Sequence, residues 1–395
     1  MRKQLFLFIG LASLVWLACK SDSKQSAPTG ADTAIPVAPA SPKPEVFVYT
    51  VAVDKLNLRE QPGKDSKVVA QLNEGELVEG VGEVSANKEE VTLRNIPYNE
   101  PYFKVTRKAY DKQSGWAFSA ALTPVYAGPR ATLPDLGQID LLAGFLKRLD
   151  VKKLDSGKKA WDYVISRYNN SKGTSADAAF FLLERFLFRM EVEGDFYEMT
   201  ETINWADSDY EAIYEEKFDM AKYPATKTLA DNGFRLEVGE GMVFPVVNWM
   251  KLGDFFLNKV TPPTKQYIEQ YILEQKDQMW SDGGIIIPLE NVADRAVWWE
   301  KFNNMHPYFV RNEETLNNEK GLLFMLIYGA DNTPAFDYET NAPTEDFQKA
   351  WAYIRQNHAG TGVEKAIREL TDLVAAEGGK RTKKVEALME KYATE

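Results

Sequence analysis

The chain has 395 residues, of which 44% are hydrophobic, and its formal net charge at pH 7 is −11. This length suits two domains rather than one, and the hydrophobic content is sufficient for a packed core. The negative charge argues against nucleic-acid binding, which requires a basic surface. It argues equally against attachment to anionic lipid by charge alone.

Cysteine and histidine are both rare, which excludes several classes of enzyme. The chain has one cysteine, Cys19, so no disulfide can form within it and no thiol nucleophile follows residue 44. The two histidines, His306 and His358, lie in no HExxH or other metal-ligand spacing. The sequence also contains no P-loop, Rossmann or GxSxG pattern. We therefore expect no metal, no cofactor and no catalytic residue of these types.

Residues 1–18 have the composition of a secretory leader. Arg2 and Lys3 precede an apolar run that ends at Ala18 and is too short for a membrane-spanning helix. Cys19 follows directly, so the junction resembles the lipobox of bacterial lipoproteins, although Trp16 stands where that family usually has leucine. The resemblance implies that Cys19 carries palmitate or a similar acyl chain and anchors the protein in a membrane. The alternative is an ordinary cleaved leader.

Residues 19–44 form the second segment, which is rich in serine, alanine, threonine and proline and lacks aromatic residues. Such a segment buries too little surface to fold, so we predict a lipidated flexible tether. After Cys19, its residues would span about 28 Å on average as a flexible chain. Lys20 stands where inner-membrane lipoproteins usually have aspartate, so the same resemblance favours the outer membrane.

Residues 45–126 show strand-like alternation of apolar and polar residues, interrupted by turn sequences such as Gln61-Pro62-Gly63. Short strands at turn spacing, without a helical signal, predict a small β-barrel. An insert between residues 82 and 101 alternates over Glu89–Asn95, which predicts an additional hairpin. We expect five strands in the barrel itself: Ala52–Arg59, Lys67–Leu72, Glu76–Val84, Tyr102–Thr106 and Trp116–Phe118.

Three motifs in this segment resemble the bacterial SH3 domain of envelope and cell-wall proteins. LNLREQPG, from Leu56 to Gly63, is similar to the LNVRxxPS/G signature of that family. Gly115-Trp116 followed by Leu122 resembles its closing strand, and Tyr102-Phe103-Lys104-Val105 occupies the place of its W-x-K-V. The resemblance implies an SH3-like barrel that binds peptidoglycan peptides or a neighbouring protein. The insert departs from the family pattern, so the binding groove cannot be transferred from it.

The resemblance carries over Arg59, Tyr102 and Trp116 as ligand-binding residues. Each also has a structural interpretation that the sequence leaves open. Trp116 suits the core of a small barrel, because buried aromatic rings dominate such cores. Arg59 suits a local brace, because its planar guanidinium can hold a turn carbonyl or a carboxylate.

From residue 135 to residue 395 the hydrophobic period changes from two to about 3.6, which predicts a larger, mostly α-helical domain. Ile139, Leu142 and Leu146 recur on one helical face, and Ala179–Met190 is apolar around most of its circumference. We therefore predict that the segment Ala179–Met190 lies in a central buried helix.

Two acidic segments of the helical domain are candidates for a glycan-hydrolysing site. Glu237 and Glu240 precede an apolar run, and Asp331 and Asp337 lie in a polar loop after an apolar helix. A carboxylate from each segment, on opposite sides of a cleft, would supply the acid and the base that glycan hydrolysis requires. The alternative is structural, because Asp, Asn and Thr-Pro commonly form turns and caps.

The sequence thus leaves three hypotheses. The first is an envelope lipoprotein that binds cell-wall material or a partner protein through its SH3-like domain. The second is a peptidoglycan glycan hydrolase that uses carboxylates of the helical domain. The third is a scaffold whose barrel packs on its own helices and binds nothing alone. We favour a binding protein over an enzyme, attached to the membrane by its N-terminal lipid and without a nucleic-acid partner.

Overall fold

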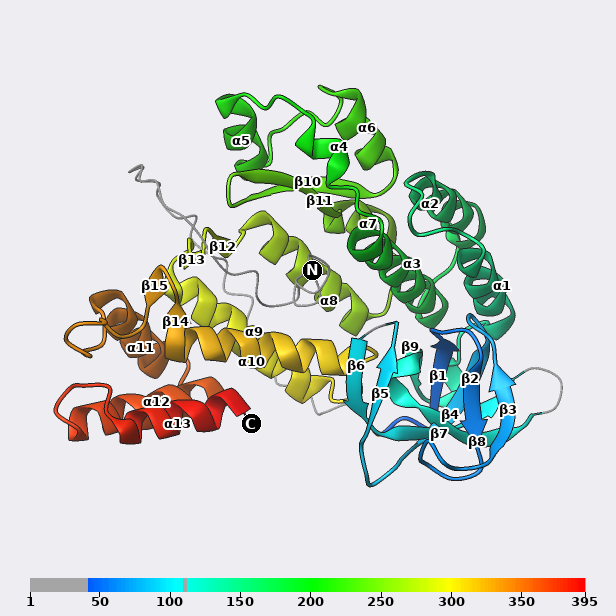
Figure 1. Cartoon of the computed structure of the whole chain (residues 1–395), viewed down its shortest axis with the longest axis horizontal. Helices are drawn as coiled ribbons and strands as arrows, with labels where there is room; N and C mark the ends of the chain where they lie inside the picture. The colour runs from blue at the N-terminus through cyan, green and yellow to red at the C-terminus, as the bar shows by residue number, and fades with distance from the viewer. Residues whose placement is uncertain (1–41, 95, 109–111, 395) are drawn as a thin grey trace.

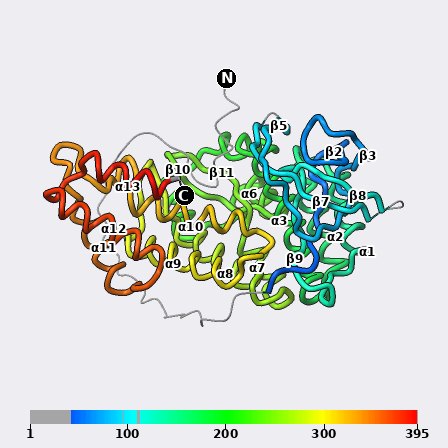
Figure 2. Tube along the Cα trace, turned by 90° about the horizontal axis from the view of Figure 1, so that it is seen from below, coloured from blue at the N-terminus to red at the C-terminus, as the bar shows by residue number. Residues whose placement is uncertain are grey.

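The computed structural model describes residues 42–394, except for 95 and 109–111. The expected leader, Cys19 and most of the tether lie outside the described residues. A β-rich region lies at one end of the molecule and helices α11–α13 lie at the other, with the remaining helices between them (Figures 1 and 2). Among the described residues, none of the helices combines the length and apolar character needed to cross a bilayer.

The β-rich region is a seven-stranded antiparallel sheet with the strand order β3-β2-β8-β7-β4-β1-β9. Its strands are β1 (Val46–Val51), β2 (Leu56–Arg59), β3 (Val68–Leu72), β4 (Leu77–Val84), β7 (Tyr102–Arg107), β8 (Ser114–Phe118) and β9 (Leu122–Gly128). The prediction of a β-region followed by a larger helical region is therefore confirmed. The prediction of five strands is wrong, because β1 and β9 pair with each other across the whole length of the region.

The first predicted strand, Ala52–Arg59, was also wrong. The chain turns between β1 and β2, where Lys55 has a φ of 55°. Val51 therefore ends β1, Val53 lies in the turn, and Leu56 and Leu58 belong to β2.

The insert forms a separate two-stranded hairpin, β5 (Glu89–Leu93) and β6 (Ile96–Glu100), paired from Glu89↔Glu100 to Leu93↔Ile96. Figure 1 shows this hairpin on the side of the β-rich region that faces the helices.

A short 3-10 turn, η1 (Ser119–Ala121), joins β8 to β9, and a second, η2 (Arg130–Thr132), precedes the helical region. The longest helix, α3, contains the predicted buried segment, and its Phe180, Phe181 and Leu183 are fully buried. The helices are α1 (Leu136–Lys147), α2 (Asp155–Tyr168), α3 (Thr174–Glu193), α4 (Glu198–Glu201), α5 (Asp207–Tyr214), α6 (Pro224–Asp231), α7 (Trp249–Phe256), α8 (Pro262–Lys276), α9 (Leu289–Met305), α10 (Asn312–Tyr328), α11 (Glu345–Asn357), α12 (Gly362–Ala376) and α13 (Lys383–Thr394).

Three small hairpins interrupt the helices. They are β10 (Phe234–Gly239) with β11 (Met242–Val247), β12 (Trp280–Ser281) with β13 (Gly284–Ile285), and β14 (Gly329–Ala330) with β15 (Thr333–Pro334).

Capping residues explain where several helices begin. Asp135 accepts hydrogen bonds from the backbone of Gly137 and Gln138 at the start of α1. Thr361 accepts one from the Glu364 backbone at the start of α12. Such side chains satisfy donors that the first turn of a helix leaves unpaired.

The β-rich region and the helices share one hydrophobic core. Val46, Val48 and Val125 on β1 and β9 belong to the same cluster of buried residues as Leu142 on α1 and Leu183 on α3. A second, smaller cluster fills the inside of the barrel: Tyr49, Val51, Leu56, Leu58, Leu72, Val78, Val105, Ala117, Ala121 and Leu122. Since burial of apolar surface is the main stabilising term, this shared core holds the two regions together.

Candidate binding site

Arg59, Trp116 and Lys104 form a row on the outer face of the barrel. Trp116 on β8 is paired with Arg59 on β2 and with Lys104 on β7. Directly paired residues share a face of the sheet, and their neighbours Val105 and Ala117 fill the inner core. The ammonium group of Lys104 lies 6.0 Å from the centre of the Trp116 ring. The row therefore places an aromatic ring between two cations, of which Lys104 also pairs with Glu83 at 3.0 Å.

The structural interpretation of Trp116 as a core residue is wrong. Trp116 is half-buried and lies outside the inner cluster, whereas Gly115 and Ala117 on either side point inward. The expected brace at Arg59 is present, because its guanidinium donates to the Ser66 carbonyl oxygen at 2.6 Å. A guanidinium has five N–H donors, so this bond leaves others for a ligand.

Tyr102 lies on the same outer face, but the insert hairpin covers it. Tyr102 is 4% exposed, and its ring packs edge-on against Phe118 at 5.5 Å between ring centres. Its hydroxyl donates to the Glu89 carboxylate on β5 at 2.7 Å. Burial raises the pKa of Tyr102, and the hydrogen bond and charge of Glu89 raise it further. Tyr102 thus holds the hairpin rather than facing solvent.

A cavity of about 180 Å³ remains between the hairpin and the barrel. Arg59 and Tyr102 line it from the barrel, and Val91 and Leu93 line it from the hairpin. The Glu89 carboxylate that bonds Tyr102 also accepts from the backbone of Lys64, a further lining residue, at 2.8 Å. The structure therefore brings Arg59 next to both Tyr102 and Trp116, but the insert covers one part of that surface.

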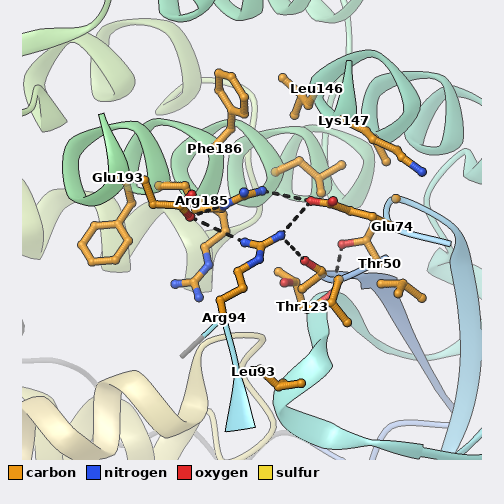
Figure 3. A pocket seen from close by; sticks show the side chains of 18 of the residues that line it. Thr50, Glu74, Leu93, Arg94, Thr123, Leu146, Lys147, Arg185, Phe186 and Glu193 are labelled. Atoms are coloured by element: carbon orange, nitrogen blue, oxygen red, sulfur yellow. Dashed lines mark hydrogen bonds and ion pairs between the residues drawn. The ribbon is translucent and has the colours of Figure 1, made fainter. Parts of the chain in front are cut away.

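The tip of the hairpin reaches a second cavity between the barrel and α3, which the sequence did not indicate. Arg94 donates to the Ala52 carbonyl oxygen at 2.7 Å and to Glu74 at 3.1 Å, and its guanidinium lies 3.5 Å from Glu193 (Figure 3). Arg189 on α3 bonds the same two carboxylates, at 3.2 Å and 3.1 Å. These four residues, the Arg94 network, tie the hairpin, the barrel and α3 together.

Glu237 and Glu240 lie on the hairpin β10–β11. Burial raises the pKa of Glu237, which accepts a hydrogen bond from Gln275 at 3.4 Å. Glu240 and Gly241 form the tip of the hairpin with φ values of 53° and 70°. Positive φ at both positions is typical of a tight hairpin turn.

Asp331 and Asp337 lie on exposed turns. Asp331 is in the tight turn between β14 and β15. Asp337 accepts hydrogen bonds from the Thr340 backbone and hydroxyl, both at 2.7 Å, and these bonds lower its pKa. The hairpin β12–β13 lies between the two acidic segments, contacting β10 on one side and β14 on the other. Neither of the two cavities described above contains any of the four carboxylates.

Two further carboxylates on α3, one partly buried and one buried, were missed by sequence analysis. Glu191 accepts from the Val247 backbone at 2.6 Å, and burial raises its pKa to about 8. Glu184 pairs with Arg311 at 2.9 Å. In the part of the chain that the structure describes, no group of three or more acidic or histidine side chains is arranged to hold a metal ion.

The comparison with protein families decides the nature of the β-rich region. A family model described as the bacterial SH3 domain matches residues 54–123. The chain contains a bacterial SH3 domain. The match begins between β1 and β2 and ends within β9, and it includes the insert hairpin and all three residues of the outer row. No curated protein and no solved structure matches the chain.

Proposed function

We propose that this protein is an envelope lipoprotein that binds cell-wall material through the outer face of its SH3 domain. The match to the bacterial SH3 domain over residues 54–123 carries the proposal, because domains of this family are typically cell-wall-binding modules. The helical region shares a core with the domain and fixes its orientation.

The outer row offers suitable chemistry for such a ligand. Peptidoglycan combines sugar rings, which have apolar faces, with peptides that carry carboxylates. The half-buried ring of Trp116 supplies an apolar platform of the kind that favours stacking. Arg59 and Lys104 on either side supply cations for a carboxylate, and a guanidinium can bind one through two parallel hydrogen bonds. A protein partner with an acidic, aromatic surface is the other ligand that this row suits.

Retention on purified sacculi tests the proposal. We expect the full chain to be retained and Trp116→Ala to lose about tenfold in affinity, or about 1.4 kcal/mol. Trp280→Ala is the matched control, because Trp280 is also partly buried but lies outside the SH3 domain. Equal and negligible retention of all three proteins would exclude wall binding and leave a partner protein as the ligand.

The membrane anchor is a separate part of the proposal. Cys19 would carry the lipid and the following tether would let the folded part reach the wall from the membrane, with the outer membrane favoured. Labelling cells with a clickable fatty acid tests this, with Cys19→Ser as the control. We expect label on the wild-type protein alone, and an unlabelled wild-type protein would end the idea.

A further inference from the structure

A cavity of about 350 Å³ lies between the SH3 domain, the hairpin tip and helices α1 and α3 (Figure 3). Its volume falls within the range of about 300–1,000 Å³ that is usual for small-molecule sites. Both apolar and charged side chains line it. Leu93 and Ile96 line it from the hairpin, and Leu182 and Phe186 line it from α3.

The side chains that line this cavity carry more positive than negative charges. Four cationic and two acidic side chains line it: Arg94, Lys147, Arg185, Arg189, Glu74 and Glu193. Both carboxylates are engaged by Arg94 and Arg189 in the Arg94 network. Lys147 lies 4.0 Å from Asp54. Among the described residues, Arg185 is the one cation of the lining with no carboxylate within ion-pair distance.

Arg185 extends from α3 into the cavity (Figure 3). Its side chain is exposed, and its guanidinium lies 5.7 Å from the centre of the Phe188 ring. The surrounding protein and the charge of Arg311 lower the pKa of Arg185, whereas the charges of Glu184 and Glu314 oppose this shift. Because no carboxylate of the described residues lies within ion-pair distance of this exposed guanidinium, its N–H donors are available to an anion that enters the cavity.

We propose that this cavity binds the carboxylate of a small ligand with an apolar body, with Arg185 as the anchoring residue. One unpaired guanidinium matches one negative charge, and its fork fits the two oxygens of a carboxylate. The apolar walls from the hairpin and α3 suit an aliphatic chain. The free C-terminus of a short peptide and a short fatty acid share this chemistry.

This proposal does not rest on wall binding by the outer row. Arg185 lies on α3, whereas Trp116 lies on β8 and does not line the cavity. A protein that fails to bind sacculi can therefore still bind a carboxylate here, and the two results are distinguishable.

Calorimetric titration of the purified full chain tests the site with two matched pairs of probes. Acetyl-Ala-Ala is compared with its C-terminal amide, and hexanoate is compared with hexanamide. We expect at least one acid to bind and its amide to bind about tenfold more weakly or worse, since hydrogen bonds to a charged group are stronger than those to a neutral one. Tighter binding of the peptide acid would identify a peptide ligand, and tighter binding of hexanoate a lipid-derived one.

Variants of Arg185 show whether the guanidinium is responsible. Arg185→Met keeps the length of the side chain and removes its charge, so it should abolish the preference for acid over amide. Arg185→Lys should retain part of that preference and covers the case in which the Met variant does not fold. Arg167→Met is the control, because Arg167 is also on a helix, 6.0 Å from the centre of an aromatic ring, but does not line the cavity. Equal binding of acid and amide, or no binding of either acid, would overturn the proposal.

Discussion

Replacing Glu191 by glutamine should stabilise the protein at alkaline pH. Glu191 lies on α3, and its carboxylate accepts a hydrogen bond from the Val247 backbone. Burial raises its pKa from 4.5 to about 8, and the charge of Glu237 adds to this effect. Glutamine keeps an oxygen for the same hydrogen bond and carries no charge at any pH.

The sign of the pH dependence follows from proton binding. Between pH 4.5 and pH 8 the folded protein holds a proton at Glu191 that the unfolded chain releases. The free energy of unfolding therefore falls as the pH rises through this window. A pKa that rises from 4.5 to about 8 on folding lowers the free energy of unfolding by at most about 5 kcal/mol once the pH exceeds 8. Because Glu191 keeps part of its surface accessible, solvent screening should reduce the effect to about 2 kcal/mol.

The assay is urea unfolding of the wild-type protein and Glu191→Gln at pH 5 and pH 8.5. We expect the two proteins to differ by less than about 0.5 kcal/mol at pH 5, and the variant to be more stable by about 2 kcal/mol at pH 8.5. Glu211→Gln is the control, because Glu211 is exposed on α5. Parallel pH profiles of the wild-type protein and Glu191→Gln would refute the reasoning.

Three further predictions concern the insert hairpin, the barrel and the helical core. Glu89→Gln weakens the hydrogen bonds to Tyr102 and the Lys64 backbone, so the backbone amides of β5 and β6 should exchange with deuterium faster. Unchanged exchange would contradict the role of Glu89 in holding the hairpin on the barrel. Gly115→Ala places a Cβ atom 2.7 Å from atoms of β2, so thermal unfolding should show a stability lower by about 1–3 kcal/mol. Gly144→Ala is the control, because Gly144 has open space around it and the variant should lose no stability. Arg311→Met leaves the buried Glu184 carboxylate without its partner, so the free energy of unfolding at neutral pH should fall by about 3–5 kcal/mol. The double variant with Glu184→Gln should recover part of this loss. Equal losses in the single and the double variant would contradict the pairing.

Local patterns predicted the elements whose burial is set within a short stretch of sequence. The apolar circumference of Ala179–Met190 marks a largely buried helix, and the structure buries most of that segment within α3, with Arg185 exposed. The motifs around Leu56 and Trp116 marked the SH3 domain, because turn and strand residues are local signals. β1 and β9 were missed as a pair because their hydrogen bonds join opposite ends of the region, from Val46↔Gly128 to Val51↔Leu122.

In the candidate sites too, features that depend on neighbouring residues could be predicted and features that depend on distant contacts could not. The brace at Arg59 spans seven residues and could be predicted from its position beside a turn. The outward orientation of Trp116 depends on its pairing with Lys104, and Tyr102 is covered by an insert with no counterpart in the family pattern. The cavity at Arg185 depends on contacts such as Arg189 to Glu74, which are 115 residues apart. No local signal in the sequence links these residues, so only the fold identifies that site.

Site-specific photo-crosslinking in living cells tests the binding of the wall by the outer row most directly. A benzophenone amino acid at position 116 would react with whatever contacts this face of the SH3 domain, and mass spectrometry would identify the adduct. The account predicts adducts with the masses of peptidoglycan fragments at position 116 and none at position 280. Adducts with a protein alone, or the same adducts at both positions, would contradict it.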